Sequence, residues 1–315
     1  MIKITVDAQV YEALQKAFPK PANSAHRALA KYISVLEAML FKSLHFAATP
    51  LQRKLNLFTI SLQQLANQGG QIGPNKLRVH AWLRNNNFNL VEPVILGTSQ
   101  SKVVSQCKLT KLVTMVDTLA VEDKILRSGK SDTEIDQHLC GDDFGNYQVL
   151  NLLFPEFKQR IKSPEIEELF DLVPVDKESV KSYIIWLTTE SEKISQEKKD
   201  QALRQARIIL AISSVMDGYY VQRKKPSLFG RMYYEGTSVQ NINKELRRAV
   251  LGNCFEYDIR SSVVAWKMGW AKQYIDAREQ GEDLRKVFSA TLNFLEDKAD
   301  FMGTVQYFTF GDDSP

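Results

Sequence analysis

Residues 60–109 change from helical to strand periodicity within one short stretch, and this change restricts the fold more than any other feature of the chain. The segment ISLQQLANQ predicts a short helix, GGQIG a glycine turn, and PNKLRVHAWLRNNN a second helix with Pro74 near its start. Two β-branched runs follow in FNLVEPVILGTSQSKVVSQCKL, and the polar link between them predicts a hairpin. The stretch therefore predicts a small unit of two helices and two strands.

This order of helix, turn, helix and hairpin is typical of a winged helix. In that fold the second helix enters the major groove of DNA, and the hairpin, or wing, rests on the phosphate backbone. We expect the helix to bury Leu77, Ala81 and Trp82. The side chains expected to bind DNA are Asn75, Lys76, Arg78 and Arg84 on the helix and Lys102 at the wing. A winged helix that contacts proteins is the alternative.

Charge is distributed in blocks along the chain. Residues 1–115 carry 14 lysines and arginines against 4 acidic residues, and residues 201–250 carry 9 against 3. Residues 116–200 carry 11 against 19, and residues 251–315 carry 7 against 11. Two basic blocks separated by an acidic one predict two surfaces for a polyanion such as DNA. Chance variation between helical surfaces is the alternative.

Composition favours a soluble protein of the cytoplasm. The chain is 44% hydrophobic and 25% charged, and its apolar runs are too short to cross a bilayer. The start MIKITVD alternates like a strand and does not resemble a signal peptide. Three cysteines without a pairing pattern indicate a reducing compartment. We therefore expect no membrane partner.

Periodicity and charge predict an α+β fold, mainly α, in four parts. The first is a strand–helix–helix unit, in which Val10, Leu14 and Phe18 share one helical face and Ser24 caps the second helix. The acidic third part is mostly helical, and its segment DQHLCGDD predicts a loop rather than a metal site, because no second ligand pair at zinc spacing occurs. The four parts are residues 1–48, 49–116, 117–200 and 201–315.

The fourth part begins with features that suit nucleic acid. Aromatic and basic residues follow one another from Tyr219 to Lys225, where rings could stack on bases and cations could follow phosphates. Further on, Asp258 lies in the β-prone run CFEYDIRSSVVAW. This carboxylate either caps the following helix or binds a divalent metal ion.

The stretch FGRMYYEGTSVQNINKELRRAVL…FEYDIRSSVVAW resembles the palm segment of family A DNA polymerases and, more distantly, of single-subunit phage-type RNA polymerases. The resemblance covers about 45 residues, in which a Gly-Arg pair, a Gln-Asn-Ile run, an Arg-containing helix and an Asp-bearing strand follow in order. It implies that Arg231, Gln240 and Asn241 touch the primer–template and that Asp258 with the Ile259 carbonyl binds Mg²⁺. Arg247 and Arg248 would hold phosphates.

The chain also departs from that family. Val263 stands where the family has a glutamate that excludes a ribose hydroxyl, and Ser289 stands where it has a lysine. The His-Asp-Glu hairpin is absent, and we interpret Gly311-Asp312-Asp313 as unrelated, because it follows Asp258 too closely. The palm is therefore predicted to be incomplete.

Two functions follow from these features. The leading hypothesis is a replication-type, template-dependent nucleotidyltransferase with Mg²⁺ at Asp258, in a truncated or inactive form. The alternative is a non-enzymatic DNA-binding initiator or transcriptional regulator of a plasmid or phage that uses the winged helix. A scaffold whose basic faces meet acidic proteins is a third hypothesis.

Overall fold

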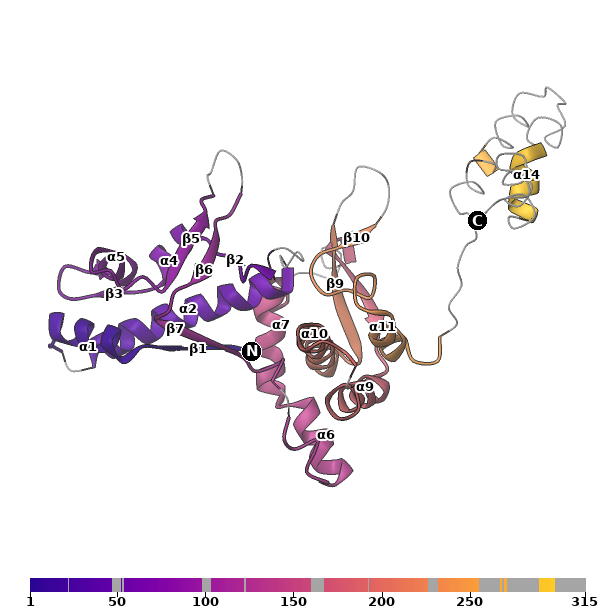
Figure 1. Cartoon of the computed structure of the whole chain (residues 1–315), viewed down its shortest axis with the longest axis horizontal. Helices are drawn as coiled ribbons and strands as arrows, with labels where there is room; N and C mark the ends of the chain where they lie inside the picture. Colours follow the sequence, from indigo (N-terminus) through magenta and orange to yellow (C-terminus); the bar gives the residue numbers. More distant parts are fainter. Residues whose placement is uncertain are drawn as a thin grey trace, which may run out of the picture. The chain divides into compact units, whose positions relative to one another are not determined.

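A computed structural model describes the protein in two compact units, residues 1–253 and residues 254–315 (Figure 1). In the second unit it describes the helix α14 (Ser289–Glu296) and a few other residues. The fold class is mixed α and β with more helix than strand, as predicted. The described residues are 1–21, 23–46, 52, 54–97, 103–121, 123–159, 167–191, 193–225, 232–254, 267, 269–270 and 289–297.

The chain begins with the predicted strand and two helices. The strand β1 (Ile2–Val6) runs antiparallel to β7 (Val113–Asp117). Helix α1 (Ala8–Ala17) buries Val10 and Leu14, as their spacing predicted. Ser24 was expected to cap the second helix, but it is the first residue of α2 (Ser24–Phe46), where its buried hydroxyl has no hydrogen-bond partner among the described residues.

Two helices and a three-stranded sheet follow α2. The strand β2 (Phe58–Thr59) precedes α4 (Leu62–Gln68) and α5 (Val79–Asn85), and the hairpin of β5 (Val91–Ile95) and β6 (Gln106–Leu109) comes next. The strands lie in the order β2-β6-β5, so β2 pairs with the second strand of the hairpin. The two helices and the hairpin are in the predicted order.

The start of α5 differs from the prediction. The helix was expected from Pro74 onward, but β3 (Gln71–Ile72) and β4 (Leu77–Arg78) form a small hairpin there. Gly70, Gly73 and Lys76 all have positive φ, which a continuous helix does not allow. Leu77 was expected to be buried, but it is 38% exposed in the short strand.

The acidic segment is mostly helical, as predicted, but it also contains a strand. Gly141, with φ 64°, separates α6 (Asp132–Cys140) from α7 (Asp143–Leu153), so the predicted loop at DQHLCGDD is mainly helix ends. Asp142 caps α7. The elements that follow are the 3-10 helix η1 (Pro155–Gln159), β8 (Phe170–Pro174), α9 (Lys177–Thr189) and α10 (Gln196–Val215).

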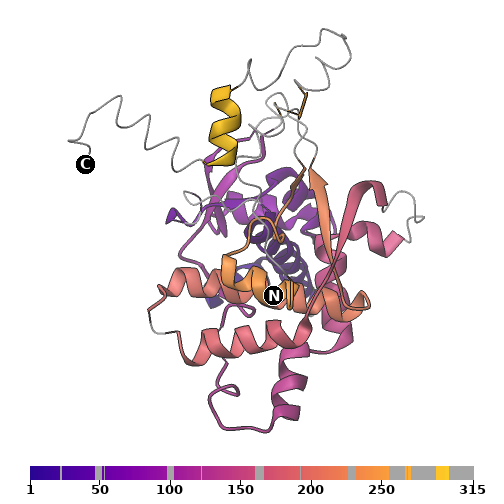
Figure 2. The same cartoon turned by 90° about the vertical axis from the view of Figure 1, so that its right-hand side faces the viewer.

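The basic segment after α10 forms a strand. β9 (Tyr219–Lys225) pairs with β8 on one side and β10 (Tyr233–Tyr234) on the other, and α11 (Lys244–Leu251) follows. Asp217 and Gly218 have positive φ and turn the chain from α10 into β9. Helices α9 and α10 pack side by side against this part of the chain (Figure 2).

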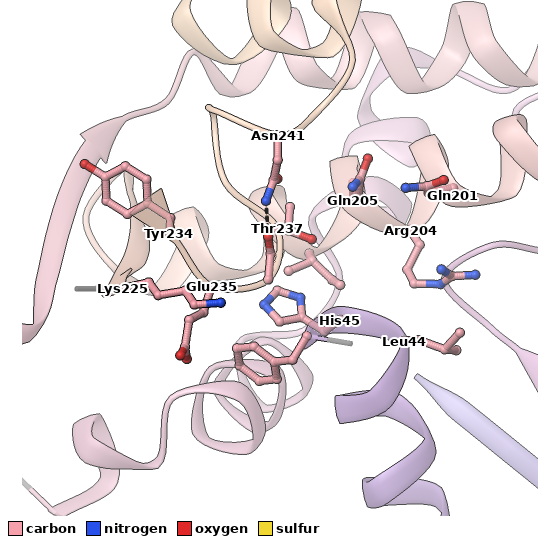
Figure 3. Close-up of a pocket in the computed structure, with 13 residues that line it drawn as sticks. Leu44, His45, Gln201, Arg204, Gln205, Lys225, Tyr234, Glu235, Thr237 and Asn241 are labelled. Carbon is pink, nitrogen blue, oxygen red and sulfur yellow. Dashed lines mark hydrogen bonds between the residues drawn. The ribbon is translucent and has the colours of Figure 1, made fainter. Parts of the chain in front are cut away.

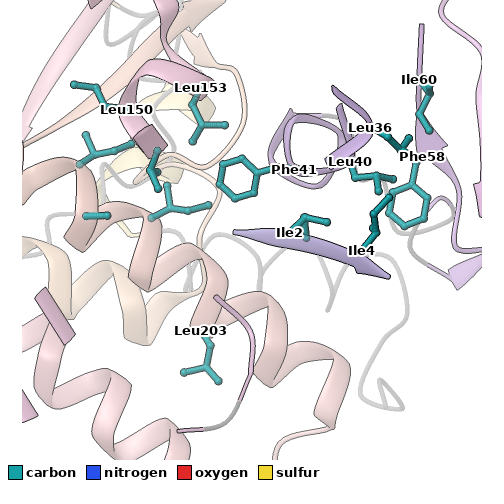
Figure 4. Packing of buried hydrophobic residues seen from close by; sticks show 14 of the residues in the cluster. Ile2, Ile4, Leu36, Leu40, Phe41, Phe58, Ile60, Leu150, Leu153 and Leu203 are labelled. Carbon is teal, nitrogen blue, oxygen red and sulfur yellow. The ribbon is translucent and has the colours of Figure 1, made fainter. Parts of the chain in front are cut away.

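One continuous hydrophobic core joins these parts of residues 1–253. Phe41 of α2 is 1% exposed and points toward Leu150 and Leu153 of α7 (Figure 4). On the other side of α2, Leu36 and Leu40 lie beside the strand β1 (Figure 4). Because α2 contacts α7 and also β2, it connects the β2-β6-β5 sheet to the helices of the second half.

Candidate nucleic-acid interface

Four of the five residues predicted to bind DNA through the winged helix are exposed on one short stretch. Asn75 and Lys76 lie in the turn between β3 and β4, Arg78 ends β4, and Arg84 lies on α5. Arg78 donates a hydrogen bond from Nη1 to Asn67 Oδ1 of α4 over 2.6 Å. Lys102, the fifth residue, lies outside the described residues.

The buried face of α5 explains why Arg84 faces outward. Val79, Trp82 and Leu83 are buried, and Trp82 stacks on Phe88 with ring centroids 5.9 Å apart. Residue 84 falls on the opposite side of a helix with 3.6 residues per turn. Packing therefore fixes the helix and leaves its basic face to solvent.

His80 links this helix to α2. The Tyr32 hydroxyl lies 2.9 Å from His80 Nδ1, and burial together with nearby Arg84 lowers the pKa of His80. Its contact with the buried Tyr32 ties α5 to α2.

The β5–β6 hairpin is apolar where a wing would be expected to carry cations. Val94, Ile95 and Leu96 on one arm are 51–69% exposed, and Val103 and Val104 on the other are 52% and 42% exposed. Phosphates are bound by cations and hydrogen-bond donors, so these side chains offer them little. This exposed apolar patch was not among the predicted sites, although the β-branched runs of the two strands signal it in the sequence.

The second basic block is paired with the acidic one inside the chain. Arg223 makes a bidentate pair with Glu156, over 2.6 Å and 2.8 Å, and its guanidinium lies 4.9 Å from the centre of the Phe170 ring. Lys224 pairs with Asp171 over 3.0 Å. Two arginines of α10 also pair with aspartates of the acidic block, Arg204 with Asp117 and Arg207 with Asp123. These four cations are therefore not an open polyanion surface.

The aromatic residues of this block are also engaged. Tyr220 is fully buried and donates a hydrogen bond to the Thr237 carbonyl over 2.8 Å. Tyr234 donates to Asp171 Oδ2 over 2.6 Å. Tyr220, one of the two rings expected to stack on bases, thus ties β9 to the loop after β10, and Tyr234 ties β10 to β8.

The Gln-Asn run of the palm resemblance forms a self-bonded loop. Asn241 accepts from the Ser238 amide over 2.9 Å and donates to the Gly236 carbonyl. Gln240 is exposed and donates to the Met232 carbonyl over 3.1 Å. Asn243 then caps α11 by accepting from the Leu246 amide.

The arginines of α11 behave differently from one another. Arg247 donates from Nε to the Val239 carbonyl over 2.8 Å and from Nη2 to the carbonyls of Gln240 and Ile242. It therefore holds the loop that precedes its own helix. Arg248 is exposed on α11.

The metal-binding part of the resemblance lies outside the described residues. These residues are Asp258 and Ile259; Arg231, expected at the primer–template, and the Gly-Asp-Asp sequence at 311–313, interpreted as unrelated, also lie outside the described residues. Among the residues that are described, no group of three or more His, Cys, Asp or Glu side chains could hold a metal ion. Mg²⁺ binding at Asp258 stays a prediction.

Comparisons with known proteins add no relative. No protein-family model, curated protein or solved structure matched the chain. Within the described part of the chain, no helix has both the length and the apolar character that a membrane span requires. Function is therefore argued from the chain's own residues.

Proposed function

We propose that the protein binds duplex DNA through a winged helix formed by α2, β2, α4, α5 and the β5–β6 hairpin. The observation that carries this proposal is the strand order β2-β6-β5, in which the strand before the two helices pairs with the second strand of the hairpin. Together with the element order, it supports a winged helix rather than an unrelated pair of helices beside a hairpin.

Exposed polar side chains give the α5 region its chemistry. Arg78 and Arg84 can each make a bidentate contact with guanine or a phosphate, and Lys76 adds a point charge at the preceding turn. The apolar hairpin contributes shape, with Lys102 as its one cationic side chain between the strands. Such a protein would act as the initiator or regulator expected of a mobile element.

Duplex binding by the full chain tests the proposal, measured by fluorescence anisotropy over a range of salt concentrations. We expect affinity to fall steeply with salt, because cations that bind phosphates release counterions. Each of Arg78→Ala and Arg84→Ala should weaken binding by about 1–3 kcal/mol.

The matched control changes the same number of charges elsewhere. Lys124 and Lys130 are exposed in the acidic segment, and replacing both by alanine should leave the affinity unchanged. Equal losses from the two pairs of substitutions would contradict the proposed interface. Failure to retain DNA even at low salt would favour a protein-binding scaffold.

Nucleotidyl transfer is a separate proposal, supported by the ordered motifs within residues 229–271. Asn241 and Arg247 are bonded within their own loop, so the proposal depends on Arg231 and Asp258, with the exposed Gln240 and Arg248 beside the loop. Primer extension with Mg²⁺ tests it directly. Template-directed extension that Asp258→Ala abolishes would support it, and extension unaffected by that substitution would contradict it.

A further inference from the structure

A cavity of about 520 Å³ lies between the end of α2, one face of α10 and the loop that follows β10 (Figure 3). Its volume is in the range of pockets that hold small molecules, about 300–1,000 Å³. It is separate from α5 and from the residues proposed to bind duplex DNA. None of the features in the sequence analysis pointed to it.

His45 is the unusual group in its wall. The side chain is 6% exposed, and neither ring nitrogen has a hydrogen-bond partner among the described residues. Burial, with a smaller contribution from Arg204, lowers the pKa of His45 to about 3, so the ring is neutral and offers one donor and one acceptor. Leaving a buried polar group unpaired costs about 1–3 kcal/mol, which implies that something else satisfies it.

The loop beside His45 is shaped to approach this ring. Gly236 has φ 71°, and a Cβ placed on it would lie 2.5 Å from His45 Nε2. Only glycine allows the backbone to pass so close to the imidazole in this conformation. The backbone of Gly236 therefore covers one edge of the His45 ring, and both residues line the cavity (Figure 3).

The wall formed by α10 adds uncharged amides. Gln201 and Gln205 are one turn apart, line the cavity, and make no hydrogen bonds to other described residues through their side chains. The charged groups nearby are already used, since Arg204 pairs with Asp117 and Glu235 with Arg223. The interior therefore offers neutral donors and acceptors.

One cation and two further aromatic rings complete the lining. Lys225 is exposed at the end of β9 and makes no ion pair with any described residue. Phe46 and Tyr234 also line the cavity. Apolar rings, neutral amides and a single exposed ammonium group match a ligand that has a polar heterocycle at one end and an anion at the other.

We propose that this cavity binds a nucleotide. The base lies inside, against the rings of His45 and Phe46 and hydrogen-bonded by Gln201 and Gln205, and the phosphate lies toward Lys225. Carboxamides complement the donors and acceptors on a base edge, as they do in DNA recognition. A phosphate does not fit the interior, because Arg204 is committed to Asp117. The same chemistry describes a free nucleotide and a nucleotide of a single strand.

Calorimetric titration of the full chain with nucleoside monophosphates, the matching nucleosides and ribose 5-phosphate tests the proposal. We expect the nucleotides to bind, the nucleosides to bind more weakly, and ribose 5-phosphate not to bind. Lys225→Ala should weaken the binding of nucleotides but not that of nucleosides. Equal binding of ribose 5-phosphate, or no binding of any base-containing compound at millimolar concentration, overturns the proposal.

Variants of the wall locate the site. Gln201→Ala with Gln205→Ala should reduce nucleotide affinity about tenfold, the equivalent of two neutral hydrogen bonds. Gln196→Ala, at an exposed glutamine on the same helix, is the control that should change nothing. An equal loss from Gln196→Ala would count against this site.

Two further experiments identify the source of the ligand and distinguish failure of this proposal from failure of the winged-helix proposal. If a short single-stranded oligonucleotide competes with the nucleotide, the base comes from a strand, and if it does not, the site takes free nucleotides. Arg78→Ala with Arg84→Ala should keep nucleotide binding intact. A chain that binds nucleotides but not duplex DNA therefore contradicts the winged-helix proposal alone.

Discussion

Residues 24–109 and residues 143–234 contain a similar succession of elements but use their basic residues differently. Each has a helix, a strand, two helices and a hairpin, namely α2, β2, α4, α5, β5 and β6 in the first region and α7, β8, α9, α10, β9 and β10 in the second. The first region also has the small hairpin of β3 and β4 between its two helices, and the second has the 3-10 helix η1 after α7. The two sheets differ in their central strand. In the first region this is β6, the second strand of its hairpin, and in the second region it is β9, the first strand of its hairpin.

A basic stretch of sequence therefore predicts a surface for polyanions only where the fold brings no acidic side chains to pair with it. Residues 1–115 contain 4 acidic residues, and Arg84 makes no ion pair with any described residue. In the second region, Arg223 and Lys224 pair with Glu156 and Asp171 from the acidic segment. The first region thus keeps at its surface the cations proposed to bind DNA, and the second pairs its cations inside the fold.

The largest expected effect tests whether the two regions fold as one. Phe41 of the first region points toward α7 of the second, and Phe41→Ala should destabilise the protein by about 3–5 kcal/mol. Urea unfolding, followed at Trp82 and Trp186 in single-tryptophan variants, should show both regions unfolding together. Tyr147→Ala, at an exposed position of α7, should cost little. Two separate transitions would make the regions independent domains.

The second effect concerns Arg223. Its removal leaves the Glu156 carboxylate largely buried without a partner, and Arg223→Ala should cost about 2–3 kcal/mol, below the range for a fully buried pair. Lys225→Ala, two residues along the same strand, is the control and should stay within about 0.5 kcal/mol. A similar cost for both substitutions would show that the ion pair has no special role.

The same pair predicts a pH dependence with a definite sign. Burial raises the pKa of Glu156, but hydrogen bonds from Arg223 and its charge outweigh this, and the pKa is lowered overall. The pair therefore stabilises the fold above the ordinary glutamate pKa of 4.5, and this contribution is lost as the pH falls through the lower folded value. Arg223→Ala should lose less stability than the wild type over that interval.

Local sequence patterns predicted much of the secondary structure. They failed where a turn in the backbone, rather than apolar spacing, sets the start of a helix or strand. Apolar spacing predicted α1, and β-branched runs predicted the β5–β6 hairpin. The helix expected at Pro74 was wrong over residues 74–78, because proline suits a turn as well as a helix start and Lys76 adopts a left-handed conformation. The strand β9 was missed, because its basic residues suggested a binding surface rather than sheet pairing.

The candidate sites were less accessible from sequence. The exposure of Arg84 follows from helical spacing, since Val79 and Leu83 fill the core. The pairing of Arg223 does not, because Glu156 is 67 positions away. His45 is one of two histidines in α2, and no local pattern shows that its nitrogens lack a hydrogen-bond partner among the described residues or that Gly236 packs against its ring. Long-range contacts of this kind leave no local pattern.

The smallest expected effect is the sharpest test of the comparison, because it applies the same substitution to both regions. Arg84→Ala should change the free energy of unfolding by no more than about 0.5 kcal/mol, since the side chain is exposed and makes no ion pair with any described residue. Arg223→Ala should lower it several times more while leaving duplex affinity unchanged under conditions where the variant is folded. Parallel unfolding and anisotropy measurements on the two variants would then give opposite patterns. If Arg84→Ala destabilises the fold as strongly as Arg223→Ala, its basic side chain also serves packing, and the contrast between a DNA-facing region and an internally paired one fails.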